Sequence, residues 1–287
     1  MLSRLLHRIK GHLQRRRQAA LRQSENCLQV LLFHGICDSP REALSRQVDP
    51  GLFTSLEMVV RSIQQCRDQG FEFVHAGDLS NLHSGRKAVL TLDDGYANNL
   101  QLLPLLHQLK VPACLFVTTS NTLTQQCFWW DVLARESRSD ENLSLARQHL
   151  KRLKPSQIVQ RLKDAFGPDC VQPMGDLDRP LNEHELRDLA ADPWVTLGNH
   201  SHEHGLFTQL SRTEITQEIQ LAQQHLTRVT GKTPRLLAYP NGRHHAEARE
   251  VAAACGIELA FGTDKLWSAL PLCKSQHLAI PRVMPSR

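Results

Sequence analysis

Apolar and polar residues along this chain form short blocks that predict strands and helices in turn. Brief apolar runs bounded by Gly, Pro or polar clusters predict buried strands, whereas apolar residues recurring every third or fourth position predict helices. The predicted strands are residues 28–33, 71–75, 88–92, 113–117, 194–197, 236–239 and 258–261. The predicted helices are residues 52–69, 98–109, 140–166, 182–190, 211–229 and 246–254. Repeated strand–helix units indicate an α/β fold with a parallel sheet or barrel in one domain, with a polar helical insertion at about residues 140–170.

Residues 1–23 have a different pattern. The apolar residues Leu2, Leu5, Leu6, Ile9 and Leu13 fall on one side of a helix, and the arginines fall mostly elsewhere. No apolar stretch is long enough for a secretory signal or a membrane span. The pattern predicts a basic amphipathic arm, either a loosely ordered tail or a helix that lies on an anionic membrane surface. A mitochondrial transit peptide has similar chemistry.

The arm also accounts for the net charge. The 287 residues carry 34 Lys and Arg against 29 Asp and Glu, a formal charge of +5. Seven of the basic residues and none of the acidic ones lie in residues 1–23, which leaves 27 against 29, or −2, for the rest. A nucleic-acid groove requires a clustered basic surface, so we expect no nucleic-acid partner.

The eight cysteines are scattered without any C-x-x-C pair, and several, such as Cys114, lie in apolar segments. This distribution predicts buried, reduced thiols, which are typical of a cytoplasmic protein.

Polar clusters follow two of the predicted strands. Asp93 and Asp94 come directly after residues 88–92, and His200 and His204 follow residues 194–197. Chemistry gathers at the carboxyl ends of strands in parallel α/β folds, although each cluster taken alone is also compatible with an ordinary loop. One Asp and two His provide a facial ligand set for a divalent metal. Zinc is favoured, and Co²⁺ or Ni²⁺ also fits.

A third predicted strand ends in Ala238-Tyr239-Pro240-Asn241-Gly242. Backbone N–H groups in such a turn can stabilise an oxyanion, although a simple loop is the commoner outcome.

Three motifs in this order, Thr91-Leu92-Asp93-Asp94-Gly95, His200-Ser201-x-x-His204 and Ala238-Tyr239-Pro240-Asn241-Gly242, resemble the polysaccharide deacetylases, also called the NodB-homology or carbohydrate esterase family 4 enzymes. The likeness extends over about residues 28–285 and includes Phe128-Trp129-Trp130-Asp131. It implies a distorted (β/α)₇ barrel that uses a divalent metal to remove N-acetyl, or sometimes O-acetyl or formyl, groups from sugars.

The resemblance also implies roles for individual residues. Asp94, His200 and His204 correspond to the metal ligands, and Asp93 corresponds to the general base that activates water. The Asn241 N–H would hold the oxyanion. We expect Tyr239 and one of Trp129 and Trp130 to contact the sugar, although core packing of both tryptophans remains an alternative.

Two features depart from the family pattern. Many relatives carry an arginine, paired with the base, where this chain has Ala238, and Arg282 or Arg235 could replace it. The general acid is usually a histidine near the last strands. His277 has the right place in the order but a poor motif, and His34, after the first strand, is its rival.

The sequence therefore predicts a cytoplasmic, metal-dependent deacetylase acting on an acetylated sugar or glycan intermediate, peripheral to the inner face of the membrane through residues 1–23. The alternatives are a catalytically impaired carbohydrate-binding protein on the same barrel, and a deformylase or cyclic-amide hydrolase of the same fold.

Overall fold

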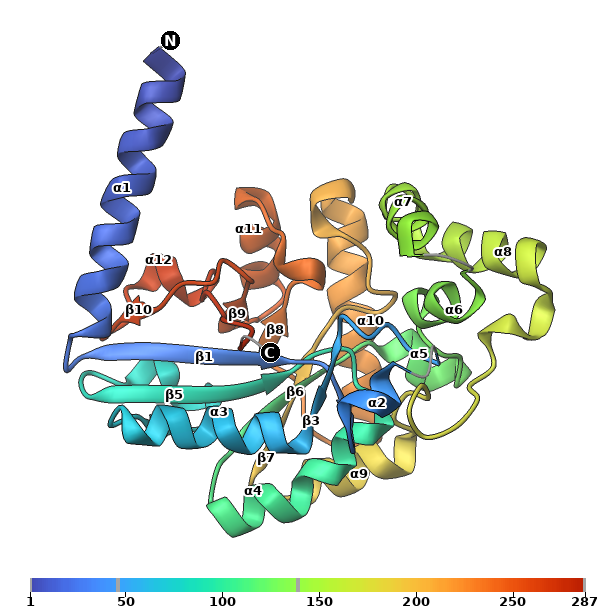
Figure 1. The fold of residues 1–287 in the computed structure, drawn as a ribbon, viewed down its shortest axis with the longest axis horizontal. Helices are drawn as coiled ribbons and strands as arrows, with labels where there is room; N and C mark the ends of the chain where they lie inside the picture. The colour runs from blue at the N-terminus through green and yellow to red at the C-terminus, as the bar shows by residue number, and fades with distance from the viewer. Residues whose placement is uncertain (1, 45–46, 138–139, 286–287) are drawn as a thin grey trace.

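A curled β-sheet forms the centre of the molecule, as the computed structural model, which describes residues 2–44, 47–137 and 140–285, shows (Figure 1). Its strands follow the order β10-β1-β5-β6-β7-β8-β9, with β4 paired to β5. These pairs are parallel except for β10, which is antiparallel to β1. The strands are β1 (Cys27–Phe33), β4 (Glu72–Phe73), β5 (Arg86–Leu92), β6 (Ala113–Val117), β7 (Val195–Asn199), β8 (Leu236–Ala238), β9 (Leu259–Phe261) and β10 (Ser268–Ala269). A separate pair consists of β2 (Gly35–Cys37) and β3 (Phe53–Ser55).

Helices surround this sheet, and their apolar faces cover its buried strands. The described α-helices are α1 (Leu2–Arg22), α2 (Pro40–Ala43), α3 (Leu56–Asp68), α4 (Leu103–Leu109), α5 (Thr119–Thr124), α6 (Trp129–Glu136), α7 (Asp140–Leu150), α8 (Pro155–Phe166), α9 (Glu183–Ala191), α10 (Arg212–Thr230), α11 (Ala246–Ala254) and α12 (Lys274–His277). The predicted α/β class and the distorted (β/α)₇ barrel in a single domain are confirmed.

The C-terminal segment, residues 280–283, links the two sides of the curled sheet. Ile280 bridges β9 at Phe261, and Val283 bridges β1 at Leu31, both in parallel orientation. This segment thereby carries Arg282 into the interior, where the side chain is 0% exposed. A residue far from the aspartates in sequence is thus placed beside the carboxyl ends of β1 and β5.

Most predicted elements agree with the structure, and β6 and α11 agree residue for residue. The helix predicted over residues 52–69 is wrong at its start, because residues 53–55 pair with β2 and the Ser55 side chain caps α3. The helix predicted over residues 98–109 begins as a 3₁₀ turn, Ala97–Leu102, before α4.

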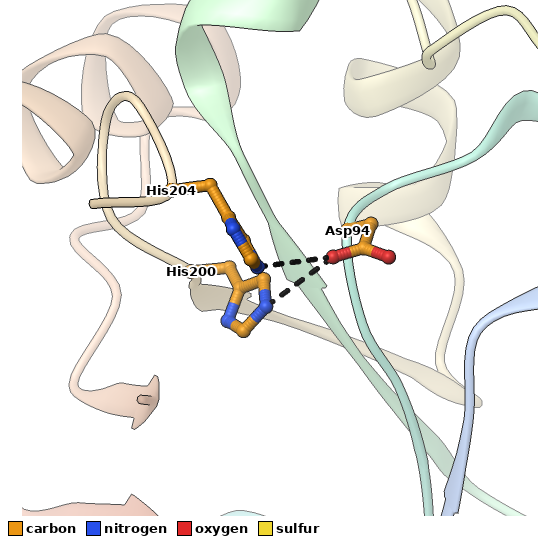
Figure 2. A group of neighbouring side chains, drawn as sticks. All are labelled: Asp94, His200 and His204. Atoms are coloured by element: carbon orange, nitrogen blue, oxygen red, sulfur yellow. Dashed lines mark ion pairs between the residues drawn. The ribbon is translucent and has the colours of Figure 1, made fainter. Parts of the chain in front are cut away.

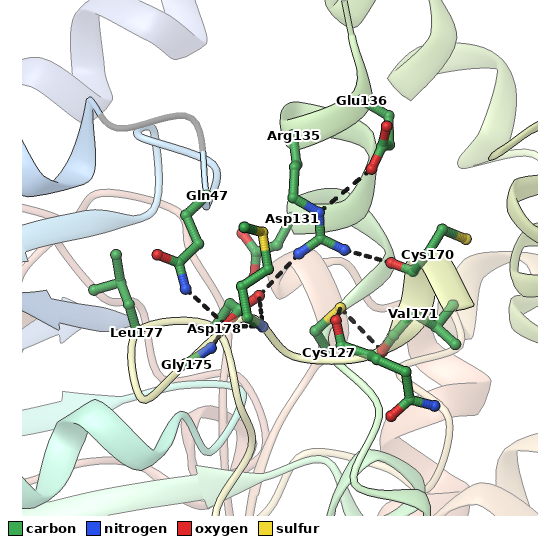
Figure 3. Close-up of polar contacts among 12 residues, drawn as sticks. Gln47, Cys127, Asp131, Arg135, Glu136, Cys170, Val171, Gly175, Leu177 and Asp178 are labelled. Atoms are coloured by element: carbon green, nitrogen blue, oxygen red, sulfur yellow. Dashed lines mark hydrogen bonds and ion pairs between the residues drawn. The ribbon is translucent and has the colours of Figure 1, made fainter. Parts of the chain in front are cut away.

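The predicted insertion consists of α7 and α8, separated where Pro155 begins a new helix, and both pack on α6. Arg135 of α6 attaches the insertion to the following loop (Figure 3). It donates to Asp178 at 3.0 Å and to the carbonyl of Cys170. Asp178, which is 0% exposed, also accepts from the Gln47 side chain and the backbone N–H of Gly175. These contacts fix the insertion beside the end of the sheet where β1 and β5 finish (Figure 1).

The basic arm is helix α1, which leaves the body at the start of β1 (Figure 1). The Gln18 side chain bonds both the N–H and the carbonyl of Trp267, and Leu21 is buried. Leu13 is exposed, whereas the side chains of residues 2–10 lie outside the described part of the structure. The last turn of the arm is therefore part of the folded body. No described helix is both long enough and apolar enough to cross a membrane.

The structure pairs none of the eight cysteines in a disulfide, and six of them are buried. The prediction that most of the thiols are buried is confirmed by this arrangement.

Candidate active site

Strand β5 delivers the two aspartates to the edge of the sheet. Asp93 donates its backbone N–H to the carbonyl of Phe33, the last residue of β1, and Asp94 adopts a left-handed backbone with φ of 77°. At Gly95, where φ is 87°, a Cβ atom would lie 3.1 Å from Val117 Cγ1. This tight turn leaves both carboxylates almost fully buried, at 3% and 2% exposure.

The two histidines lie on the loop that follows β7. Ser201 and His204 both have positive φ values, so the convergence of His200 and His204 depends on a loop rather than on a helical turn. Glu218 of α10 accepts the backbone N–H groups of His202 and Glu203, at 3.0 and 2.9 Å, and holds this loop in place. The His202 ring contacts Thr119 instead of the other two histidines.

Asp94, His200 and His204 converge on one point (Figure 2). The Nε2 atoms of the two histidines lie 3.4 and 3.5 Å from Asp94 Oδ1. The other carboxylate oxygen, Asp94 Oδ2, is buried and has no hydrogen-bond partner among the described residues. The structure thus brings together the three residues that the sequence predicts as metal ligands.

Hydrogen bonding fixes the tautomer of His200. Its Nδ1 lies 2.9 Å from the carbonyl of Ala238, which can only accept, so Nδ1 carries a proton and Nε2 is the nitrogen that faces Asp94. Burial, together with the neighbouring His200, lowers the pKa of His204 to about 3. Burial also opposes a charge on His200, but Asp93 and Asp94 outweigh it and raise the pKa of His200.

Arg282 is the partner of Asp93. Its two terminal nitrogens donate to the two carboxylate oxygens at 2.6 and 2.7 Å, and its Nε donates to the carbonyl of Gly262. Burial alone would raise the pKa of Asp93, but Arg282 and His200 outweigh burial and lower it to about 2. Of the two arginines proposed from the sequence, Arg235 is excluded, because it is exposed and pairs with Glu258.

A cavity of about 310 Å³ opens onto these residues. Its lining includes His34, Asn241, Trp129 and Trp130. Trp130 is 5% exposed and its ring lies 4.8 Å from that of His204, whereas Trp129 is only half-buried and its ring is inclined by 78° to that of Trp130. Trp130 therefore packs against His204, while Trp129 is more accessible from the cavity.

Two predicted residues lie away from this cavity. Tyr239 is 0% exposed, packs against Phe207 and donates its hydroxyl to the carbonyl of Leu278, so the prediction that it contacts the sugar is corrected. His277 belongs to α12, which lies toward α1 at the opposite end of the sheet from the insertion (Figure 1). Neither residue lines the cavity, whereas His34 does, so His34 replaces His277 as the candidate general acid.

The sequence reasoning missed a buried polar chain behind Trp130. The indole N–H of Trp130 donates to the Tyr96 hydroxyl at 2.8 Å, and this hydroxyl donates to Asp131 Oδ2 at 2.6 Å. Asp131 Oδ1 accepts the backbone N–H of Asp49 at 2.7 Å. Burial raises the pKa of Asp131 well above its ordinary value. This chain orients the indole that packs on His204, and no local sequence signal links Tyr96 to Asp131.

Replacing Tyr96 with phenylalanine is expected to destabilise the protein by about 2–4 kcal/mol, because two buried polar groups, the Trp130 N–H and the Asp131 carboxyl, each lose a partner. Tyr239→Phe is the matched control. It removes one hydroxyl whose acceptor belongs to the half-buried Leu278, and about 1 kcal/mol is expected. Denaturant unfolding measures both changes. Equal losses in the two variants would contradict the role of the chain behind Trp130.

Comparison with known proteins agrees with this geometry. The family model for polysaccharide deacetylase matches residues 81–260, and the chain belongs to this family. No curated protein sequence matches the chain significantly.

Solved structures give the same fold. A de-N-acetylase from Aggregatibacter actinomycetemcomitans superposes with a TM-score of 0.63 at 15% identity, over 90% of this chain and 95% of that one. The deacetylase domain of BpsB from Bordetella bronchiseptica gives 0.59 at 18% identity, over 91% and 96%. The Streptococcus pyogenes deacetylase PplD, solved in complex with acetate, gives 0.57 at 16% identity, over 91% and 93%. At these identities the likeness establishes the fold and does not extend to the residues of the site.

Proposed function

We propose that this protein is a metal-dependent hydrolase that removes N-acetyl or O-acetyl groups from a sugar or glycan. The observation that carries the proposal is the buried Asp94–His200–His204 cluster beside the Asp93–Arg282 pair, at the base of a cavity with tryptophan in its wall. Membership of the polysaccharide deacetylase family supports carbohydrate deacetylation as the reaction class.

The residues present fit a divalent cation. One carboxylate and two imidazoles form a facial donor set with open positions. The buried Asp94 Oδ2 has no partner among the described residues and lacks the compensation that a cation supplies. The Nδ1–H bond of His200 to the Ala238 carbonyl is the outer contact typical of a metal-bound histidine. Zinc suits two imidazole ligands, and Co²⁺ or Ni²⁺ fits the same set. A cation bound there supplies Lewis acidity toward the acetyl carbonyl and the attacking water.

The protein's own groups would handle the protons. Asp93 accepts a proton from the water that adds to the acetyl carbon, and Arg282 keeps this carboxylate ionised and aligned. The Asn241 backbone N–H stabilises the negative charge that develops on the acetyl oxygen. His34 donates a proton to the sugar nitrogen as the carbon–nitrogen bond breaks, which yields acetate and an amine. Trp129 offers an indole face to the sugar ring.

Acetate release tests this proposal. The purified full chain is incubated with N-acetylated chito-oligosaccharides, an O-acetylated sugar and an N-formylated sugar, each with and without a chelator. We expect acetate from the acetylated sugars, and we expect the chelator to stop its release. Binding of the sugars without any product would favour the carbohydrate-binding alternative, and formate as the only product would favour a deformylase. The Asp93–Arg282 pair supports a catalytically active site. Arg282 gives Asp93 the arginine contact that Ala238, at the position where many relatives carry an arginine, cannot make.

Arg282→Met is expected to move the acid limb of the pH profile of kcat/KM to higher pH. The pKa of Asp93 is held at about 2 against burial, so loss of the guanidinium raises this pKa and leaves less of the carboxylate ionised at mildly acidic pH. Arg282→Lys, which keeps the charge, should move the limb less. Arg135→Met removes an arginine that also pairs with a buried aspartate and serves as the control. An acid limb that stays in place in Arg282→Met would contradict the role of the pair.

We propose further that the protein works at the cytoplasmic face of an anionic membrane through α1. Arg15, Arg16 and Arg17 are exposed on this helix, and no acidic residue occurs in residues 1–23. Each basic residue near an anionic surface contributes about 1 kcal/mol, so replacing these three by Gln should weaken binding to vesicles containing anionic phospholipid by about 100-fold.

Acetate release from a soluble sugar should stay unchanged in this triple variant, because the Gln18 and Leu21 contacts with the body remain. A truncated protein that lacks the free part of α1 should begin at Gln14, one helical turn before Gln18, so that the Gln18 and Leu21 contacts are kept. Vesicle sedimentation measures the binding, with vesicles of neutral phospholipid as the control. Equal binding of native and triple-variant protein would contradict the membrane role.

A further inference from the structure

The insertion brings positive charge to the mouth of the active-site cavity. Arg147 of α7 and Lys151, which directly follows α7, both line the cavity that contains Asp94 and His204. Neither residue belongs to the set that the proposed acetyl chemistry uses. The question is therefore which charge these two cations face when a substrate is bound.

Lys151 is a cation in excess of the acids around it. Its Nζ donates to one neutral acceptor, Asn241 Oδ1, at 3.0 Å, and no ion pair joins it to a carboxylate in the described part of the chain. An ammonium group has three donors, so two remain for a ligand. The side chain is half-buried, and burial together with the nearby charges of Arg147 and Arg243 lowers the pKa of Lys151. An added anion would relieve this crowding of positive charge.

Arg147 has an ion pair but leaves two buried donor nitrogens without hydrogen bonds among the described residues. It forms an ion pair with Asp49 at 2.5 Å, and Asp49 is itself 5% exposed. The two nitrogens are Nε and Nη2, and the contact of Nη2 with Asp49 is an ion pair without hydrogen-bond geometry. A buried guanidinium donor without an acceptor is costly, and an oxyanion in the cavity would satisfy it.

The other acids of the cavity are already engaged. Asp93 pairs with Arg282, and Asp94 belongs to the histidine cluster. A second groove adjoins the cavity at Lys151, and its lining includes Arg152 and Arg243. The same lining holds one acid, Asp264, so the positive charge of the cavity mouth continues into this groove from Lys151.

We infer that the substrate carries an anionic group, a phosphate or a carboxylate, next to its acetylated sugar, and that Lys151 and Arg147 bind this group at the cavity mouth. The inference rests on the proposed deacetylase function and narrows its substrate class. An anion at this position also fixes the register of the sugar, so that one acetyl group faces the Asp94–His200–His204 cluster.

The test compares three N-acetylated probes with the full-length protein: N-acetylglucosamine 1-phosphate, an N-acetylated uronic acid and the neutral methyl glycoside of N-acetylglucosamine. We expect Lys151→Met to lower kcat/KM for the anionic probe whose charged group, phosphate or carboxylate, the site binds. This loss should be about 10- to 100-fold larger than the loss for the neutral probe. Lys151→Arg should restore most of this difference. Lys274→Met removes an exposed lysine on α12 and should leave all three values unchanged.

Calorimetric titration of N-acetylglucosamine 1-phosphate and of the uronic acid gives a second readout that does not depend on turnover. Weaker binding of one anionic probe by Lys151→Met supports the inference and identifies phosphate or carboxylate. Equal losses on neutral and anionic probes, or no loss on either, would overturn it. If the native protein releases acetate from no sugar but still binds an anionic probe through Lys151, the hydrolase proposal fails while the anion site stands.

Discussion

Asp93→Asn is expected to lower kcat for acetate release by about 10²- to 10⁴-fold while the bound metal remains. The amide can still accept a hydrogen bond from Arg282, so the buried guanidinium keeps a partner and the barrel stays closed at residues 280–283. It cannot accept the proton of the attacking water. Arg282 helps to lower the pKa of Asp93 to about 2, so the native carboxylate is ionised at neutral pH and can accept that proton.

The control for this variant is Asp178→Asn. Asp178 is also a buried aspartate paired with an arginine (Figure 3). It fixes the insertion and does not line the active-site cavity. This change should lower stability and leave kcat per folded molecule unchanged. Metal content and acetate release are measured on all three proteins. Full turnover in Asp93→Asn would eliminate Asp93 as the base.

His200→Ala is expected to abolish metal binding at stoichiometric concentrations. Loss of an outer contact to a metal ligand costs about 10- to 100-fold in affinity, and loss of the ligand itself should cost more. Only Asp94 and His204 would remain, and the Ala238 carbonyl would lose the imidazole that it orients. Elemental analysis of the purified variant measures the result.

His202→Ala is the matched control, since this histidine lies on the same loop and contacts Thr119 instead of the cluster. It should retain about one metal per chain. Equal metal content in the two variants would show that the cluster is not the metal site.

The sequence was sufficient for the alternation of strands and helices and for the Asp94–His200–His204 cluster, because both depend on local signals. Asp94 and His200 each follow an apolar run that predicts a strand. These strands, β5 and β7, pair with the two sides of β6, so their carboxyl ends lie at the same end of the sheet. Element boundaries were less predictable. Residues 53–55 look like the first turn of a helix in apolar pattern, and only their pairing with β2, across a long loop, makes them a strand.

Partners that depend on distant contacts could not be predicted. Arg282 reaches Asp93 across 189 residues, so the sequence could name it only as one of two candidates. The sequence left His34 and His277 as rival candidates for the general acid, because the fold decides which of them faces the cavity. Tyr239 was misassigned because its role was predicted from a local motif. The motif ends at the cavity, but the Tyr239 side chain itself points into the core.

The most direct test of the central claim is a metal titration of the stripped protein. Zn²⁺ is added in steps, and acetate release from an N-acetylated chito-oligosaccharide is measured at each step. The proposed function predicts that activity rises in proportion to bound metal and levels off at one ion per chain, with His202→Ala following the same curve and His200→Ala remaining inactive. Acetate release that is undiminished in the stripped protein, or absent from the fully loaded one, would contradict it.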